Sequence, residues 1–324
     1  MQIEQIVADK ITLLRENLFV NAIHNRFDIK YGDNFDLYKI NNELYVPVKQ
    51  IDDSLFLGLY LIPIQYEVLE SFIEYLFKKY EKAKTIELFH VNVNYFRDIE
   101  KKPHWHVDLP DTIEEFNSGL HTNTKYNMTR YPQKIINNLG QYEIKHYSKS
   151  EITDEIVKTY LKFKEKTHNT DYQLKDPLDY IEKFYVTDCY TLEINDKIYA
   201  LLFLSNTDSN SFFENIGYDS ELSKYSLGTV LYYAVIKDLI EKKYKKFFLL
   251  GGNYEYKKRF NGILLYTIST SVKRDLGSKY LLLAKIANFS SKQNKYLSKI
   301  IDFIIKSCCF KKKYKSFYKK ITLK

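Results

Sequence analysis

The first third of the chain alternates short apolar runs with one amphipathic helical pattern. Residues 43–51 and 55–64 are rich in Val, Leu, Ile and Tyr, which is typical of strands. Residues 85–93 (TIELFHVNV) form a further strand-like run. Between these runs, residues 66–83 place apolar side chains three and four positions apart, as on one face of a helix: Val68, Phe72, Tyr75, Leu76 and Tyr80. A helix between strands predicts a layered α/β arrangement.

The pattern changes between residues 110 and 139. Residues 108–120 (DLPDTIEEFNSGL) look like the start of a helix, with Asp111 as the expected N-cap and Glu114 three residues later. The residues that follow, 123–140, are basic. We interpret this stretch as the join between two halves of the chain.

The second half repeats the α/β alternation. We predict strands over 141–147, 189–195, 197–206, 211–219 and 263–272, and helices over 152–168 and 224–244. The run at 245–252 (KKFFLLGG) is continuously apolar, which is typical of a fully buried strand. Similar order in the two halves indicates a degenerate duplication, although no residue-level repeat is evident. We therefore predict an α/β fold with mixed-sheet halves at 1–109 and 110–275 and a helical tail at 276–324.

The positive charge of the chain is concentrated near residue 324. The formal net charge is +8, and residues 306–324 contain eight lysines and no Asp, Glu or Arg. Without that segment the chain has 41 basic and 41 acidic residues, so its body is neutral. The usual association of a basic protein with nucleic acid or anionic membrane therefore applies to the tail alone. We favour a packed terminal helix with a solvated charged end over peripheral contact of the tail with an anionic membrane.

Several classes of protein are excluded by what the sequence lacks. It has no run of about 18 apolar residues, no secretory signal pattern at residues 1–17 and only three cysteines, so we expect a cytoplasmic protein without a disulfide framework. Phosphate-loop, dinucleotide, serine-hydrolase and zinc-protease motifs are all missing. We predict no metal site and no tightly bound cofactor.

One short cluster resembles a metal site in composition. On a strand, His104, His106 and Asp108 would share a face. Because no pattern nearby supplies a fourth ligand, we favour a structural role for these side chains over metal binding.

Two loops of the second half are candidates for ligand binding. Ser226, Leu227, Gly228 and Thr229 open a predicted helix, whose first N–H groups can hold a phosphate, although Ser226 alone would also serve as a plain N-cap. Gly228 would allow a close approach of the ligand to the backbone. After the buried strand, Gly251–Gly262 combines paired glycines with Asn253, tyrosines, lysines and Arg259, which suits an anionic or carbonyl-bearing ligand.

The same region resembles the GNAT acyltransferase superfamily, specifically its Fem-like branch. The branch's last motif, Tyr-x-Phe-Lys-x-x-Phe-x-Gly, has its counterpart in Tyr254, Tyr256, Lys257, Phe260 and Gly262, with Tyr256 in place of the first Phe. The apolar strand 199–204, the aromatic strand 212–218 and the sequence Leu222-Ser223-x-x-Ser226-x-Gly228 also match, and the likeness extends over roughly residues 105–270. The resemblance implies two GNAT-like halves, of which the first is degenerate.

This family transfers an acyl group from an activated ester to an amine, and it implies roles for particular residues. Lys257, at the motif lysine, would stabilise the oxyanion or the leaving group, and Tyr254 or Tyr256 would protonate the leaving group. Glu214 and Asp219 are the candidate general bases, although strand-end carboxylates usually just face water. Asn253 and Arg259 would contact the substrate. Acyl-CoA such as acetyl-CoA would be the co-substrate, held at residues 226–229, although Tyr225 and Val230 depart from the usual Gln/Arg-x-x-Gly-x-Gly/Ala pattern of the pyrophosphate turn.

We therefore predict an N-acyltransferase that uses acyl-CoA and an amine acceptor. The resemblance implies that the acceptor is an amino sugar of a cell-envelope polysaccharide or its precursor, either a small molecule or a lipid-linked one. The first alternative is aminoacyl transfer from aminoacyl-tRNA to a cell-wall precursor, which the neutral body disfavours, since phosphate contacts need many Lys and Arg. The second alternative is a non-catalytic binding protein on a transferase fold.

Overall fold

A computed structural model of the protein describes residues 1–6, 34–41, 44–59, 64–91, 101–168, 176–184, 186–206, 209–252 and 254–274. The chain forms two compact units. Among described residues, the first unit contains 1–6, 35–101 and 267–274, and residues 34 and 102–266 belong to the second. The predicted helical tail at 276–324 lies outside the described residues.

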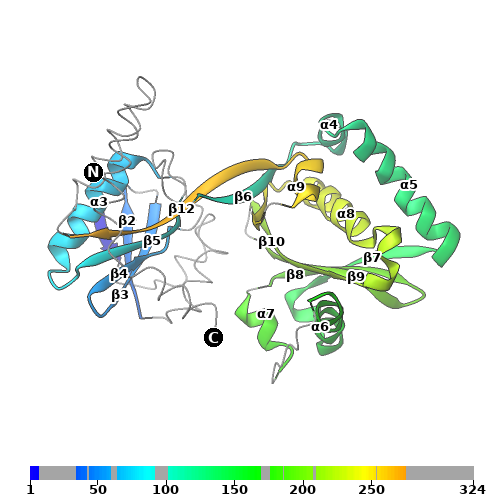
Figure 1. The fold of residues 1–324 in the computed structure, drawn as a ribbon, viewed down its shortest axis with the longest axis horizontal. Coiled ribbons are helices and arrows are strands. Elements are labelled where there is room, and N and C mark those ends of the chain that lie inside the picture. Colours follow the sequence, from blue (N-terminus) through cyan, green and yellow to red (C-terminus); the bar gives the residue numbers. More distant parts are fainter. Residues whose placement is uncertain are drawn as a thin grey trace. The chain divides into compact units, whose positions relative to one another are not determined.

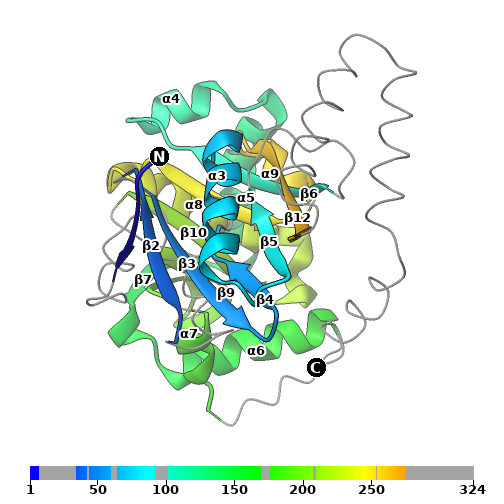
Figure 2. The ribbon, with the colours of Figure 1, turned by 90° about the vertical axis from the view of Figure 1, so that its left-hand side faces the viewer.

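The first unit is a mixed sheet with one helix. Its strand order is β1-β2-β3-β4-β5-β12, from β1 (Ile3–Ile6), β2 (Asp36–Ile40), β3 (Leu44–Ile51), β4 (Ser54–Leu57), β5 (Thr85–Val91) and β12 (Ile263–Lys273). Helix α3 (Tyr66–Lys79) connects β4 to β5, which pair in parallel, whereas β2, β3 and β4 pair antiparallel. Figure 2 shows α3 across one face of this sheet, where its apolar side chains Leu69, Phe72, Ile73 and Leu76 are fully buried.

The second unit has a mixed sheet covered on both faces. Its strands follow the order β6-β11-β10-β9-β8-β7. They are β6 (Lys101–Asp108), β7 (Tyr142–Ser148), β8 (Asp188–Ile194), β9 (Lys197–Asn206), β10 (Asn210–Tyr218) and β11 (Lys246–Gly251). The helical segments are α4 (Ile113–Ser118), α5 (Thr122–Leu139), η1 (Lys149–Glu151), α6 (Asp154–His168), α7 (Asp179–Lys183), η2 (Ser220–Tyr225), α8 (Leu227–Glu241) and α9 (Glu255–Arg259).

The hydrophobic core of the second unit has two layers. Side chains of α4, α5 and α8 pack with one face of the sheet, including Phe116, Ile135 and Leu231. Helices α6 and α7 pack on the other face through residues such as Tyr160 and Ile181 (Figure 1). The continuous apolar run predicted for a buried strand is β11, which lies between β6 and β10.

The two units repeat one arrangement, as the order of the sequence pattern predicted. In each, three antiparallel strands lead into a helix that returns to a parallel fourth strand: β2-β3-β4-α3-β5 in the first unit and β8-β9-β10-α8-β11 in the second. The predicted α/β fold with two mixed-sheet halves is therefore confirmed. Among described residues the first half has only α3 against its sheet, which agrees with its being the degenerate copy.

The strands that follow the two parallel pairs are exchanged between the units. Strand β6 comes after β5 in sequence but pairs antiparallel with β11, and β12 comes after β11 but pairs antiparallel with β5. We predicted boundaries at 109/110 and at 275/276. The contacts instead divide the chain at 101/102 and 266/267, because each sheet is completed by a strand from the other half of the sequence.

Local details differ from the sequence-based predictions at helix ends. Thr112, and not Asp111, is the N-cap of α4, with its side chain accepting from the backbone N–H of Glu115. Asp111 instead pairs with Lys245. Within the described part of the chain, no helix combines the length and apolar character needed to cross a bilayer.

Candidate functional site

The parallel strands β10 and β11 part midway along the second sheet. Their register runs from Asn210 opposite Lys246 to Phe212 opposite Phe248, and each strand has an irregularity immediately afterwards. Past this point, β10 stays paired with β9 and β11 with β6, and no further pairing joins β10 to β11 among the described residues. Backbone groups on the facing edges therefore need other partners, which a ligand placed between the strands would provide.

Helix α8 begins beside the carboxyl end of β10. Ser226 precedes the helix in the left-handed region, with φ 57°, and its carbonyl accepts from the N–H groups of Thr229 and Val230. A Cβ at Gly228 would lie 3.1 Å from the ring of Tyr218, so only glycine fits here without displacing that side chain. The N–H groups of Leu227 and Gly228, which donate to no backbone carbonyl among the described residues, are thus held next to the strand that leaves the parallel pair.

The four residues predicted to bind the co-substrate occupy different positions at this helix start. Leu227 is buried in the core and Thr229 is half-buried. Ser226 is the N-cap residue of α8 by position, as the alternative interpretation expected, but its side chain makes no capping hydrogen bond among the described residues. The backbone of this turn, together with Gly228, is what remains available for a phosphate.

Lys257 is buried at the carboxyl end of β11, with 1% of its surface exposed. Its Nζ donates to the carbonyl oxygens of Gly251 at 2.6 Å and Leu249 at 2.8 Å, and it lies within 3.4 Å of those of Leu250 and Gly252. Burial lowers the pKa of this ammonium group to about 8. Because its N–H groups are directed at main-chain oxygens, this geometry favours a positioning role over the predicted direct contact with an oxyanion.

The turn that Lys257 holds carries the two candidate tyrosines. Tyr254 is 61% exposed and its ring lies 6.1 Å from that of Tyr256, at an interplanar angle of 26°. Tyr256 is half-buried against Phe213 of β10 and Tyr232 of α8, at ring separations of 6.4 and 5.5 Å. Burial raises the pKa of Tyr256, with the neighbouring Tyr254 adding to the shift, so its phenol keeps its proton at neutral pH. The structure thus brings a proton donor to the place where the strands part.

The two carboxylates that we predicted as general bases have different surroundings. Glu214 sits in the irregularity of β10, between Phe213 and Asn215, and is half-buried at the parting of the strands. Asp219 accepts from the backbone N–H of Glu221 as the N-cap of η2 and lies 4.0 Å from Lys166. Asp219 therefore has a structural task, and Glu214 is the stronger candidate base.

The predicted substrate contacts are only partly described. Arg259 is exposed on α9, one turn after Glu255. Asn253 lies outside the described residues. The predicted roles of both in substrate binding stay predictions.

The histidine cluster of β6 has a structural environment. His106 packs on Phe248 at a ring separation of 5.9 Å and its Nε2 is 3.5 Å from Asp108, which also pairs with Lys246 at 2.5 Å. Burial lowers the pKa of His106. No group of three His, Cys, Asp or Glu side chains suited to a metal ion occurs among the described residues.

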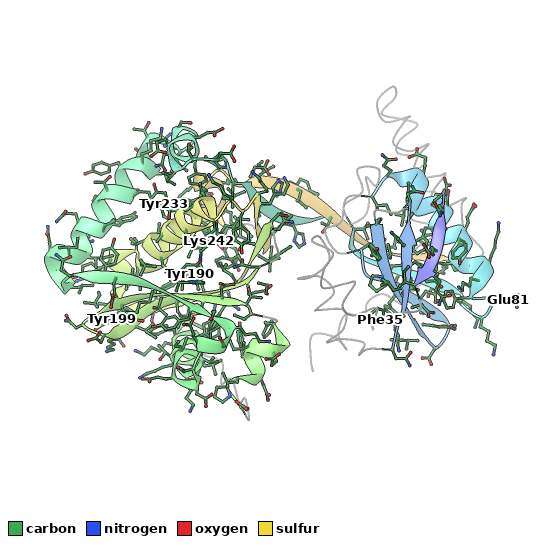
Figure 3. All side chains as sticks on the ribbon, turned by 180° about the vertical axis from the view of Figure 1, so that it is seen from behind. Phe35, Glu81, Tyr190, Tyr199, Tyr233 and Lys242 are labelled. Carbon is green, nitrogen blue, oxygen red and sulfur yellow. The ribbon has the colours of Figure 1, made fainter. Side chains whose placement is uncertain are left out.

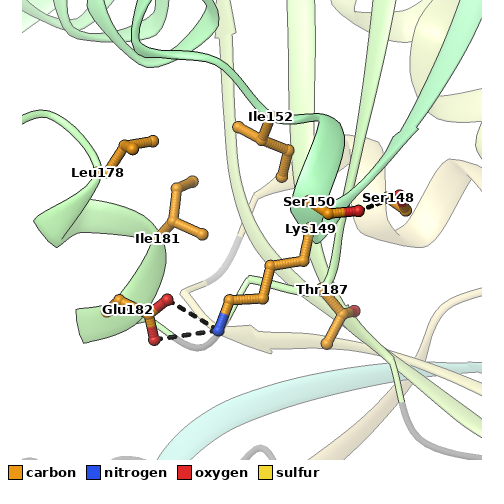
Figure 4. A pocket seen from close by; sticks show the side chains of 8 residues that line it. All are labelled: Ser148, Lys149, Ser150, Ile152, Leu178, Ile181, Glu182 and Thr187. Carbon is orange, nitrogen blue, oxygen red and sulfur yellow. Dashed lines mark hydrogen bonds and ion pairs between the residues drawn. The ribbon is translucent and has the colours of Figure 1, made fainter.

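A separate hollow lies on the opposite face of the second sheet, beside η1 and α7 (Figure 4). Lys149 and Glu182 form an ion pair of 2.9 Å across it. Its other lining residues are Ser148, Ser150, Ile152, Leu178, Ile181 and Thr187. Because Ile152 and Ile181 belong to the core layer under α6 and α7, this hollow is distinct from the site at α8 and α9.

Sequence reasoning missed one residue of the site, Tyr232. Its ring joins Phe213, Phe247, Tyr256 and Phe260 beneath the parting strands. The sequence places it on the apolar side of the helix at 224–244, where an aromatic side chain normally signals packing alone. Only the unpaired state of its buried hydroxyl among the described residues sets it apart.

Comparison with known proteins supports the family predicted from the motifs. Residues 123–258 match the family model described as acetyltransferase (GNAT) domain. No curated protein matches the sequence significantly. Solved structures share the fold at low identity. FemX aligns with a TM-score of 0.59 and 9% identity over 88% of this chain and 100% of its own.

Two further structures extend this comparison. L-PGS from Bacillus licheniformis aligns with a TM-score of 0.53 and 10% identity over 88% of this chain and 98% of its own. The C-terminal domain of a putative lysylphosphatidylglycerol synthetase from Agrobacterium fabrum gives a TM-score of 0.52 and 12% identity, over 83% and 92% of the two chains. Residues 123–258 are therefore similar in sequence to a GNAT acetyltransferase domain, and the chain shares its fold with FemX and L-PGS.

Proposed function

We propose that this protein is an N-acyltransferase that moves an acyl group from acyl-CoA to an amine. The observation that carries the proposal is the parting of β10 and β11 after Phe212 and Phe248, inside a GNAT domain and next to the start of α8. The parted edges suit an extended acyl carrier, and the helix start suits its phosphates.

The donor would be held mainly by backbone groups. The N–H groups at the start of α8 would bind the pyrophosphate of CoA, and the tight packing of Gly228 on Tyr218 keeps that turn in place. In this proposal the backbone N–H groups take over the role of the Gln or Arg that the common pyrophosphate turn carries at the position of Tyr225. The thioester would then lie between the parted strands, whose N–H groups on the facing edges would support the oxyanion.

The chain's own side chains supply the proton transfers of the reaction. Glu214 would take a proton from the amine, whose nitrogen attacks the thioester carbonyl. As the tetrahedral intermediate collapses, the C–S bond breaks and Tyr256 gives its proton to the leaving sulfur. Solvent then reprotonates Tyr256, and Glu214 releases its proton to water. Lys257 would act by holding the turn that carries Tyr256.

The acceptor we propose is an amino sugar of a cell-envelope polysaccharide or its precursor. It rests on likeness in fold to proteins such as FemX, which is an analogy and not a property of the site. A cytoplasmic enzyme acting on small or lipid-linked amines would fit this acceptor. Screening radiolabelled acetyl transfer from acetyl-CoA to glucosamine and to N-containing envelope precursors would test it.

A second candidate keeps the fold and changes the donor to aminoacyl-tRNA. One structural neighbour is named as a domain of a putative lysylphosphatidylglycerol synthetase, which motivates this candidate. The neutral charge of the body outside residues 306–324 argues against a large RNA interface. A filter-binding assay with tRNA would test this candidate. Binding that remains when the lysines of residues 306–324 are replaced, and that weakens steeply as salt is added, would support it over the first candidate.

A third candidate is a non-catalytic binding protein. It predicts that Lys257→Ala and Tyr256→Phe leave every acyl-transfer assay unchanged.

Isothermal titration with CoA and acetyl-CoA tests the proposed donor. The variant Thr229→Asp places a carboxylate in the first turn of α8, where the helix dipole favours it but a bound pyrophosphate would be repelled. At about 5 Å and an effective dielectric near 40, each phosphate charge contributes roughly 1.5 kcal/mol, so a loss of at least tenfold in affinity is expected. Asn123→Asp, in the first turn of α5, is the matched control and should bind like the parent. Absence of binding to the parent at millimolar ligand would contradict a CoA donor.

A further inference from the structure

Tyr232 is a polar residue in an otherwise aromatic environment. It lies on α8 with 2% of its surface exposed. Its ring is 5.0 Å from that of Phe260, 5.7 Å from Phe247 and 6.1 Å from Phe213. Tyr256, at 5.5 Å, supplies the other phenol of this cluster. Apart from the phenol of Tyr256, the rings around Tyr232 carry no polar group that could form a hydrogen bond with its hydroxyl.

The hydroxyl of Tyr232 is buried and has no hydrogen-bond partner among the described residues. Other buried tyrosines of the protein are satisfied: Tyr38 bonds to Tyr80, Tyr180 to Tyr160, and Tyr190 to Asp238. Buried polar groups are nearly always paired, because an unpaired one loses its hydration without compensation. Other buried polar atoms of the described residues also lack a partner, but the Tyr232 hydroxyl is the one that belongs to the aromatic cluster around the candidate acid Tyr256, so we expect its partner to arrive with a ligand.

Tyr232 lies next to the candidate site, so a bound ligand could supply the missing hydrogen-bond partner. Phe213 is the first residue of β10 after the last pair with β11, and Phe247 lies in the paired part of β11. Tyr232 contacts both rings, and Tyr256, the candidate acid, contacts Tyr232. Its phenol is thus next to the point where the parallel strands separate. Burial and the neighbouring Tyr256 raise the pKa of Tyr232, so the group is a neutral donor and acceptor.

We infer that the Tyr232 hydroxyl selects the acyl group, by hydrogen bonding to a hydroxyl substituent on the acyl chain of the donor. The inference rests on the proposed function, since it places the acyl end of a CoA thioester beneath the parting strands. A plain alkyl chain would leave the phenol unpaired in the complex, whereas a hydroxyacyl chain would satisfy it.

Titration calorimetry with matched thioesters tests this selection. Butyryl-CoA is compared with 2-, 3- and 4-hydroxybutyryl-CoA. The three isomers place the hydroxyl on different carbons of the acyl chain, so the comparison shows which position Tyr232 can reach. The parent protein should bind one hydroxylated isomer about tenfold more tightly than butyryl-CoA. Tyr232→Phe should abolish this preference while binding butyryl-CoA as well as the parent does.

Tyr233→Phe is the matched control on the same helix. The hydroxyl of Tyr233, which Figure 3 labels, donates to Asn117 at 2.7 Å. Its ring lies 6.2 Å from that of Phe260, and the variant removes the hydroxyl while keeping this ring contact. This variant should keep the preference for the hydroxylated thioester and lose some thermal stability, whereas Tyr232→Phe should be as stable as the parent or more so. A loss of stability in Tyr232→Phe would reveal an internal partner and contradict the inference.

The outcomes separate the inference from the proposed function. Equal affinity of the parent for butyryl-CoA and all three hydroxylated isomers overturns the role of Tyr232 but leaves the CoA donor standing. Failure of CoA and of every thioester to bind overturns the donor itself, and the inference with it.

Discussion

The buried ammonium of Lys257 gives the sharpest test of how the site is held together. Two of its contacts, to the carbonyls of Gly251 and Leu249, are short, and both oxygens belong to the end of β11. Lys257→Met keeps the length and apolar stem of the side chain and removes these bonds. If the lysine positions the turn, the variant should lose stability as well as activity.

The magnitude follows from the contacts and from the pKa. Losing two hydrogen bonds to buried carbonyls should cost about 2 kcal/mol at pH 7. The pKa of Lys257 is about 8 in the folded protein and 10.5 as the unperturbed value. Between these values the unfolded chain binds the extra proton, so the stability contributed by this group rises with pH. The rise amounts to about 3 kcal/mol between pH 8 and pH 10.5, and below pH 8 the contribution is constant.

Urea unfolding of the parent and of Lys257→Met at pH 7, 8.5 and 10 measures both effects, because the other titrating groups cancel in the difference. Lys258→Met, an exposed neighbour on α9, is the control and should match the parent at every pH. If the difference in the free energy of unfolding between the parent and Lys257→Met does not change with pH, the claim that Lys257 is buried with a lowered pKa is refuted. A variant that keeps full stability but loses activity would instead restore the direct role at the oxyanion.

Further variants test the remaining assignments. Tyr256→Phe should lower kcat for acyl transfer at least 100-fold with little change in KM, whereas Tyr254→Phe should retain most of the activity, as steady-state kinetics with glucosamine as the acceptor would measure. Glu214→Gln should lower kcat by a similar factor, whereas Asp219→Asn, which keeps the cap of η2, should behave like the parent. Gly262→Ala should destabilise the protein by about 2 kcal/mol in urea unfolding, because the added Cβ would lie 2.2 Å from the Lys257 carbonyl oxygen.

The sequence predicts the elements of the fold better than their pairing. Periodicity locates the amphipathic helix α3, whose buried positions include Phe72 and Leu76, and the continuous apolar run identifies β11 as a central strand. The exchange of β6 and β12 has no local signal, because pairing between strands that lie more than 130 residues apart is decided by tertiary packing. Boundaries drawn along the sequence therefore miss it.

The candidate site shows the same division between what is local and what is not. The motif places Lys257 and Tyr256 on one short helix, but residue type alone does not tell whether a lysine faces a substrate or the carbonyls of its own strand. In the sequence, Asp219 and Glu214 are both carboxylates near the end of one predicted strand. The structure distinguishes them, because Asp219 accepts a capping hydrogen bond from the N–H of Glu221. Tyr232 is invisible to motif reasoning, since its distinction is an unpaired hydroxyl among the described residues.

The central claim is that the donor binds between β10 and the start of α8. Hydrogen–deuterium exchange with and without acetyl-CoA tests it most directly, because it reports which backbone amides become protected. The account predicts new protection at residues 213–218 of β10 and 227–230 of α8, with little change at η1 and α7. Protection confined to the hollow around Lys149 and Glu182, with none at α8, would contradict it.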